Sequence, residues 1–119
     1  VLTPDERRLI TANQRSNSLS LIDVESGKVL SEVACGENPT ALAFTPDGRT
    51  LLVSCRYSGD VELYSLEPRG LTKRGAIHVG MHPYGLAVDS DGKRAYVALS
   101  SDAKIAEIDL AKRQVVRTI

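Results

Sequence analysis

Two histidines, His78 and His82, are the side chains of this sequence best suited to acid–base or metal chemistry near neutral pH. Four residues of extended chain span roughly 13 Å, so the two imidazoles could not bind one metal ion together. The sequence also lacks a nucleophile elbow, a metal-ligand cluster, a paired-carboxylate spacing and a phosphate-binding loop. We therefore expect no metal site and no cofactor. His82 is a candidate ligand-binding residue, and its alternative is a purely structural or solvated role.

Two arginines and two tyrosines add further binding chemistry: Arg15, Arg56, Tyr57 and Tyr84. A guanidinium group can hold a carboxylate or a phosphate through two parallel hydrogen bonds. Exposed arginines are common on protein surfaces, so an ordinary surface position is the alternative for both arginines. Whether these side chains form one site depends on the elements that carry them.

The two cysteines, Cys35 and Cys55, are too few for a disulfide scaffold and form no C-x-x-C motif. Cys35 is expected at the end of an outer strand and Cys55 at the end of an inner strand. These strands lie about two strand spacings apart, roughly 10 Å. Because a disulfide needs Cα atoms within about 7 Å, we expect two buried free thiols.

The composition excludes several classes of partner. Lys plus Arg and Asp plus Glu each count 15, so the formal net charge is zero and gives no electrostatic reason to expect nucleic acid or an anionic membrane. Trp is absent and Phe occurs once, so the chain has no aromatic platform for stacking bases. No apolar run approaches the roughly 20 residues of a membrane-spanning helix.

Three copies of one segment begin at Leu2, Phe44 and Val88. The copies are 42 and 44 residues apart, and a Gly-x-x-Pro motif recurs at residues 36–39 and 80–83. Each repeat reads as four short strands with turns between them. The second strands are apolar on both faces, which indicates burial from both sides. Their residues are therefore predicted to be among the most buried: Leu51, Leu52, Val53, Tyr96 and Val97.

A turn of the type Pro-Asp-Gly follows the first strand of each repeat. Pro presets φ for the turn, and Gly48 accepts the left-handed conformation after it. The aspartates that recur in these turns, Asp5, Asp47 and Asp91, lack the set of neighbouring acidic ligands that a calcium site needs. Their position explains them as turn residues, and a calcium site is not favoured.

The repeats predict an all-β fold, a β-propeller of three four-stranded antiparallel blades at residues 1–40, 41–84 and 85–119. A β-solenoid has far shorter coils than these repeats. In this strand order, the loops after the second strands and the loops before the first strands meet at one end of the central channel. Those loops hold all five candidate ligand-binding residues: Arg15, Arg56, Tyr57, His82 and Tyr84. We expect them to share one face.

Three blades form a partial propeller or half of a six-bladed ring, so two sheet faces would remain uncovered. Apolar residues are expected on these faces, Leu9, Ile10, Leu19 and Leu21 on one and Tyr96, Ile105 and Ile108 on the other. Exposed apolar faces mark an interface. We expect further blades of the same polypeptide to cover them, because Val1 enters midway through an innermost strand, or else a second copy that completes a homodimer of six blades.

The stretches Leu9–Asn13, Leu19–Leu30 and Ala41–Gly48 resemble the YVTN family of β-propeller repeats, and Tyr96–Leu99 stands where the family has Tyr-Val-Thr-Asn. The resemblance covers the whole chain and implies the propeller fold. It departs at Glu6, which replaces a turn Gly. Propellers similar to these serve as surface-protein modules, as cytochrome-associated and amine-dehydrogenase subunits, and as lactonases. The resemblance therefore implies a periplasmic, secreted or cell-surface location without fixing a function.

The loops after the three second strands contain no acid–base pair. We therefore expect a non-enzymatic interaction or scaffold module that presents loops to a protein or a small ligand. The alternative is a fragment of a propeller enzyme, either lactonase-like or associated with a cytochrome or a dehydrogenase.

Overall fold

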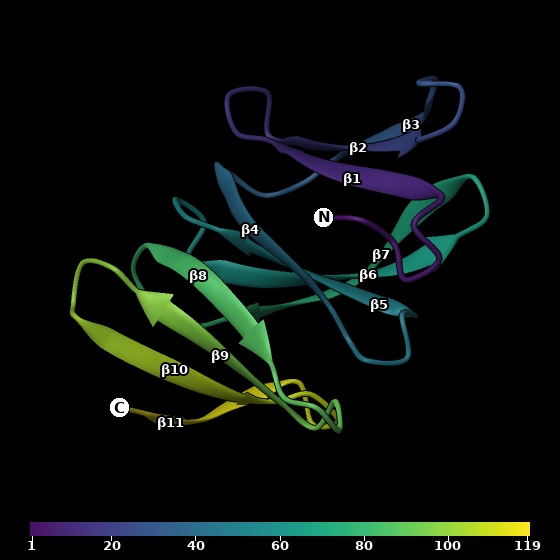
Figure 1. Cartoon of the computed structure of the whole chain (residues 1–119). Helices are drawn as coiled ribbons and strands as arrows, with labels where there is room; N and C mark the ends of the chain where they lie inside the picture. Colours follow the sequence, from purple (N-terminus) through teal and green to yellow (C-terminus); the bar gives the residue numbers. More distant parts are fainter.

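The computed structural model describes all of residues 1–119 and consists of strands and turns, with no helix. Eleven strands form three separate antiparallel sheets, and each sheet is a meander in chain order (Figure 1). The first sheet contains β1 (Arg8–Asn13), β2 (Ser18–Asp23) and β3 (Val29–Ala34). The second contains β4 (Pro39–Phe44), β5 (Thr50–Cys55), β6 (Asp60–Glu67) and β7 (Gly70–His78). The third contains β8 (Pro83–Val88), β9 (Arg94–Leu99), β10 (Lys104–Asp109) and β11 (Gln114–Thr118).

The first sheet has three strands, whereas the repeats predicted four in each blade. Its innermost strand is reduced to one bridge between Leu2 and Leu9, with flanking hydrogen bonds between Val1 and Ile10. Only three residues precede the turn that begins at Pro4, too few for a full ladder. The other two sheets have the predicted four strands.

The repeated turns have the predicted left-handed residue. Gly48 has φ +70° and Gly92 has φ +73°, and Glu6 adopts φ 60° at the corresponding place. The aspartate before Gly48 closes the turn, because Asp47 Oδ1 accepts hydrogen bonds from the Thr45 hydroxyl group at 2.6 Å and from the Arg49 amide at 2.9 Å. These turn aspartates are structural, as the sequence indicated.

The second sheet is buried on both faces because the other two sheets pack against it. Leu51 and Val53 face the first sheet, and Leu52 faces the third sheet. All three side chains are inaccessible, as is Val97 on the facing side of β9. The prediction for Tyr96 is corrected: its side chain points to the opposite face of β9, which no sheet covers, and it is only partly buried. Apolar residues on both faces of a strand therefore did not ensure burial on both faces.

The uncovered end faces also differ from the prediction. Ile10, Leu19, Leu21 and Ile108 are fully buried against the second sheet. The predicted sets mixed residues from both faces of each sheet, because side chains alternate along a strand. Tyr96 and Ile105 do lie on the outer face of the third sheet, as predicted. The outer face of the first sheet instead carries polar residues that hydrogen-bond with one another, namely Thr11, Asn13, Ser18 and Ser20.

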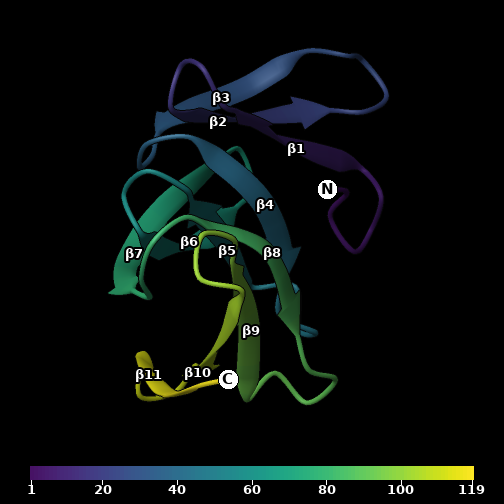
Figure 2. The ribbon, with the colours of Figure 1, turned by 90° about the vertical axis from the view of Figure 1, so that its left-hand side faces the viewer.

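The three sheets fan out from their inner strands. Strands β4 and β8 lie side by side, as Figure 1 and Figure 2 both show. This arrangement is an arc of a propeller, and it places the turns that leave β5 and β9 beside the segments that enter β4 and β8.

Candidate functional site

Four of the five predicted site residues come together at one end of the arc. Arg56 and Tyr57 directly follow β5, His82 directly precedes β8, and Tyr84 is its second residue. The guanidinium carbon of Arg56 lies 5.5 Å from the ring centre of Tyr57 and 5.9 Å from that of Tyr84. The rings of Tyr57 and His82 meet edge to face, with centres 5.9 Å apart. We call these four residues the Arg56 cluster.

Backbone hydrogen bonds between loops position the Arg56 cluster. The amides of Arg56 and Tyr57 donate to the carbonyl groups of Asn38 and Glu37 at 2.9 and 3.1 Å. The carbonyl group of Tyr84 accepts a 2.6 Å hydrogen bond from the Ser54 hydroxyl group, which ties the third sheet to the second. The cluster therefore rests on a fixed backbone frame.

His82 has a structural part in this frame. Its backbone adopts φ 53°, and its carbonyl group accepts 3.0 Å hydrogen bonds from both the amide and the hydroxyl group of Ser100. Its Nδ1 atom shares a hydrogen bond with the Ser101 hydroxyl group. Asn38 has the corresponding place in the preceding loop, with φ 57° and a carbonyl group that accepts from Arg56. The left-handed backbone and the accepting carbonyl group are thus common to Asn38 and His82, whereas the imidazole side chain occurs at this position only before the third sheet.

Arg56 carries the unbalanced charge of the cluster. It forms no ion pair with an acidic side chain, and its Nε atom is buried without a hydrogen-bond partner. Tyr57 is 59% exposed and Tyr84 is 48% exposed, so the aromatic walls beside the guanidinium group are open to a ligand. A cation between two accessible rings, with no counter-ion of its own, is suited to an anionic group.

Arg15 and His78 lie outside the cluster. Arg15 is exposed in the turn between β1 and β2 and forms no hydrogen bond or ion pair. The Nδ1 atom of His78 lies 2.9 Å from Asp60 Oδ1, so this imidazole is paired within the second sheet. No three His, Cys, Asp or Glu side chains are arranged to hold a metal ion.

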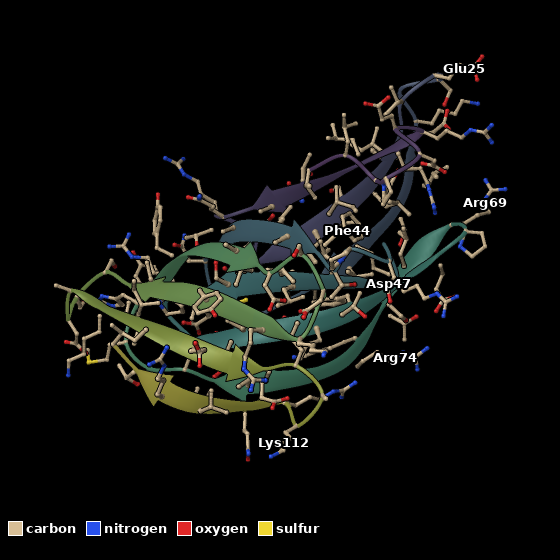
Figure 3. The ribbon with its side chains drawn as sticks, turned by 60° about the horizontal axis from the view of Figure 1, so that its bottom comes forward. Glu25, Phe44, Asp47, Arg69, Arg74 and Lys112 are labelled. Carbon is tan, nitrogen blue, oxygen red and sulfur yellow. The ribbon has the colours of Figure 1, made fainter.

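A cleft of 640 Å³ opens at the other end of the second and third sheets. Among its charged residues, Arg94 pairs with Asp109 at 2.8 Å, whereas Asp47, Asp91, Lys93 and Arg113 form no ion pair. A hydrogen bond from the Lys112 amide, with the charge of Arg94, holds the pKa of the Asp109 carboxyl group below its ordinary value. The hairpin tips that carry Glu25 and Arg69 project on this side of the molecule (Figure 3). Turns dominate this end, as the sequence predicted.

A buried polar cluster between the first two sheets was not singled out from the sequence. Glu62 accepts hydrogen bonds from the Tyr64 hydroxyl group at 2.6 Å and from Lys73 Nζ at 2.8 Å. Burial raises the pKa of the Glu62 carboxyl group, but these bonds and one from the Gly36 amide outweigh burial and lower the pKa overall. Burial and the Glu62 contact raise the pKa of Tyr64. The sequence carries one signal of this cluster: Glu62 stands at the repeat position that Ser20 and Ala106 occupy in the other two repeats.

The structure is similar to parts of solved propellers. Kuenenia stuttgartiensis hydrazine synthase superimposes with a TM-score of 0.90 and 34% identity, over 98% of this chain and 33% of that chain. A putative 6-phosphogluconolactonase from Bacteroides fragilis gives a TM-score of 0.86 and 20% identity, over 100% of this chain and 37% of that chain. The periplasmic gluconolactonase of Pseudomonas aeruginosa gives a TM-score of 0.85 and 20% identity, over 100% of this chain and 37% of that chain. This chain thus spans about a third of each.

No curated protein sequence matches the chain. The structure has no helix long and apolar enough to cross a membrane. The profile of the YNCE-like β-propeller family matches residues 1–118, and it describes a propeller family related to the YVTN repeats that the sequence resembles. The all-β propeller fold is therefore confirmed, and the chain belongs to the YNCE-like β-propeller family.

Proposed function

We propose that this propeller segment is a non-enzymatic binding module whose Arg56 cluster takes the carboxylate or phosphate group of a protein or small ligand. The observation that carries this proposal is the Arg56 guanidinium group, which lies between two open tyrosine rings without an acidic partner. A bound anion would give the guanidinium group two parallel hydrogen bonds.

The cluster supports binding better than catalysis. His82 is the histidine of the cluster, and its Nδ1 atom and carbonyl group are already engaged by serines. No carboxylate joins it in the cluster, so a paired general acid and base are missing. We infer that the aromatic rings and the guanidinium group recognise a ligand and do not transform it.

The rest of the ligand contacts would come from further blades. The chain spans about a third of the propellers it resembles, and a propeller channel is lined by loops from every blade. Additional blades of the same polypeptide, or a second copy of this chain, would complete the face on which Arg56 lies. By family resemblance, the assembled propeller would act in the periplasm or at the cell surface.

Calorimetric titration of the purified protein with inorganic phosphate and with succinate tests this proposal. Arg56→Ala should weaken binding at least about 10-fold, since loss of a charge-assisted pair costs about 1.5–3 kcal/mol. Arg56→Lys should recover part of the affinity, because it restores the charge without the planar fork. The matched control is Arg69→Ala, which removes an exposed arginine at the opposite end. Equal losses in the Arg56 and Arg69 variants, or no binding of either anion, would contradict the proposal.

The second candidate is a segment of a propeller enzyme. The 34% identity to a hydrazine synthase chain favours this reading, whereas the two lactonase likenesses rest on fold alone. An assay for hydrolysis of a sugar lactone and the absorbance spectrum of the co-purified assembly distinguish the two candidates. Lactone hydrolysis, or a haem-containing chain that co-purifies, would favour the enzyme.

A further inference from the structure

The connection between β3 and β4 crosses the ends of β5 and β6 at very close range. A β-carbon on Gly36 would lie 3.0 Å from the β-carbon of Cys55 and 2.9 Å from Glu62 Oε1. The Glu37 amide, next along the chain, donates a 2.7 Å hydrogen bond to Ser58. Only glycine leaves room for this crossing, and the crossing carries Cys35 onto the inner strands of the second sheet.

Cys35 is thus the residue next to the glycine that crosses directly over Cys55, and both cysteines belong to the apolar packing between the first two sheets. β3 ends at Ala34, so Cys35 is the first residue of the connection that leads to β4. Its amide is held by the Asn17 carbonyl group at 2.9 Å, and its side chain packs on the apolar cluster that contains Cys55. The Cys35 thiol donates to the Gly36 carbonyl group at 3.4 Å, and the Cys55 thiol lies 4.0 Å from the Val53 carbonyl oxygen.

The two thiols differ in access and in acidity. Cys55 is fully buried, whereas Cys35 is half-buried and reachable from solvent. The neighbouring Cys55 thiol lowers the pKa of the Cys35 thiol. The same contact, with burial and the charge of Glu62, raises the pKa of Cys55. Such a pair has an accessible sulfur atom that ionises first and a protected one behind it.

We propose that Cys35 and Cys55 are a thiol–disulfide exchange site that forms a disulfide when the protein meets a small disulfide such as oxidised glutathione. The Cys35 thiolate attacks one glutathione sulfur atom, and the glutathione S–S bond breaks to release a glutathione thiolate with the electron pair. Cys55 then loses its proton and attacks the Cys35 sulfur atom of the mixed disulfide, releasing the second glutathione thiolate. Two protein thiols are oxidised, one glutathione disulfide is reduced to two thiols, and the two protons pass to the products.

The new bond would join the β3–β4 connection to the end of β5, and it would close a ring over residues 35–55 that contains all of β4. Arg56 is the next residue after Cys55, and its amide already binds the same connection through Asn38. Oxidation would thus fix the frame of the Arg56 cluster, although the exchange chemistry itself does not depend on what that cluster binds.

The test equilibrates the purified, reduced protein with buffers of reduced and oxidised glutathione, followed by acid quenching and intact mass. The wild type should lose two hydrogen atoms and carry no glutathione. Cys55→Ser should stop at a glutathione adduct on Cys35, whereas Cys35→Ser should stay unmodified because Cys55 is buried. Two free thiols in the oxidised wild type, or equal adducts on both single variants, would overturn the proposal.

A peptide map and a melting curve of the wild type make the test independent of the variants' folding. Digestion without reductant should yield one linked peptide pair that contains Cys35 and Cys55 of the same chain. The oxidised protein should melt about 10 °C higher than the reduced protein, as expected when a ring of this size is closed. A disulfide between two chains, or an unchanged melting temperature, would contradict an internal link.

Discussion

At the scale of single residues, the chain contains two polar clusters with different origins. The Arg56 cluster consists of loop residues whose chemistry was visible in the sequence. The cluster around Glu62 consists of strand residues buried between two sheets. The first is suited to a ligand because its charge is unpaired, and the second is suited to stability because its charge is fully paired.

Glu62 should make stability depend on pH. Its pKa in the folded protein lies below the ordinary value, so the ionised carboxylate stabilises the fold above about pH 4 and loses this effect as the pH falls through the folded pKa. Glu62→Gln should therefore reduce the free energy of unfolding by about 1–3 kcal/mol at pH 7 and by much less at pH 3. Urea denaturation at both pH values measures the difference.

The control for this experiment is Glu25→Gln, because Glu25 is exposed in the turn after β2 and forms no hydrogen bond or ion pair. It should change stability little at either pH. If Glu62→Gln had the same effect at pH 3 as at pH 7, ionisation of Glu62 would not be the source of its contribution.

At the scale of elements, the turns determine how the sheets meet. Gly48 combines a left-handed backbone with a contact between sheets, since a β-carbon there would lie 2.7 Å from Pro4 Cγ. The turn of the second repeat thus packs directly on the turn of the first. A side chain at position 48 would therefore meet both an unfavourable backbone conformation and a clash with Pro4.

Gly48→Val should lower the free energy of unfolding by more than about 1 kcal/mol, because a β-branched residue is poorly tolerated at positive φ. Glu6→Gly is the matched control, since Glu6 adopts φ 60° in the corresponding turn and glycine relieves that conformation. It should leave stability unchanged or slightly higher. A midpoint of denaturation unaffected by Gly48→Val would show that the turn adapts without cost.

The repeats predicted strands and turns well because both depend on short-range patterns. Leu51, Leu52, Val53 and Val97 are buried as the apolar second strands indicated. The prediction that Tyr96 is fully buried was wrong, because the pattern within one strand does not show which of its faces another sheet covers.

The proximity of the candidate residues could be predicted in part, because it too follows from the repeat. Arg56, Tyr57, His82 and Tyr84 meet because neighbouring repeats present equivalent loops, whereas Arg15 comes from the first sheet and stands apart. The contact between the two cysteines depends on the path of a connection, and the repeat pattern carries no information on that path.

At the scale of the whole molecule, the three sheets form an open arc. The inner face of each end sheet packs on the second sheet, and the outer faces have no partner within the chain. On the third sheet the outer face includes Ile105, which is 42% exposed, and the partly buried Tyr96. A neighbouring blade is the partner that this surface fits, because every inner face in the structure is covered in that way.

Ile105→Glu should weaken association through the third sheet without affecting the fold, since the side chain is exposed and adds little to the core. The expected result is a shift of at least about 10-fold in the concentration needed for association, with an unchanged melting temperature of the dissociated chain. Sedimentation equilibrium of the variant and the wild type gives both association constants. An identical constant for the variant would mean that this face is not in the contact.

The central claim is that these sheets are one arc of a larger ring, and the mass of the purified 119-residue chain in solution tests it most directly. Light scattering at micromolar concentration should give about twice the 12.9 kDa of one chain, or a larger assembly, because uncovered sheet faces drive blades together. A soluble, cooperatively folded monomer of 12.9 kDa would show that the end faces need no partner, and it would contradict the claim.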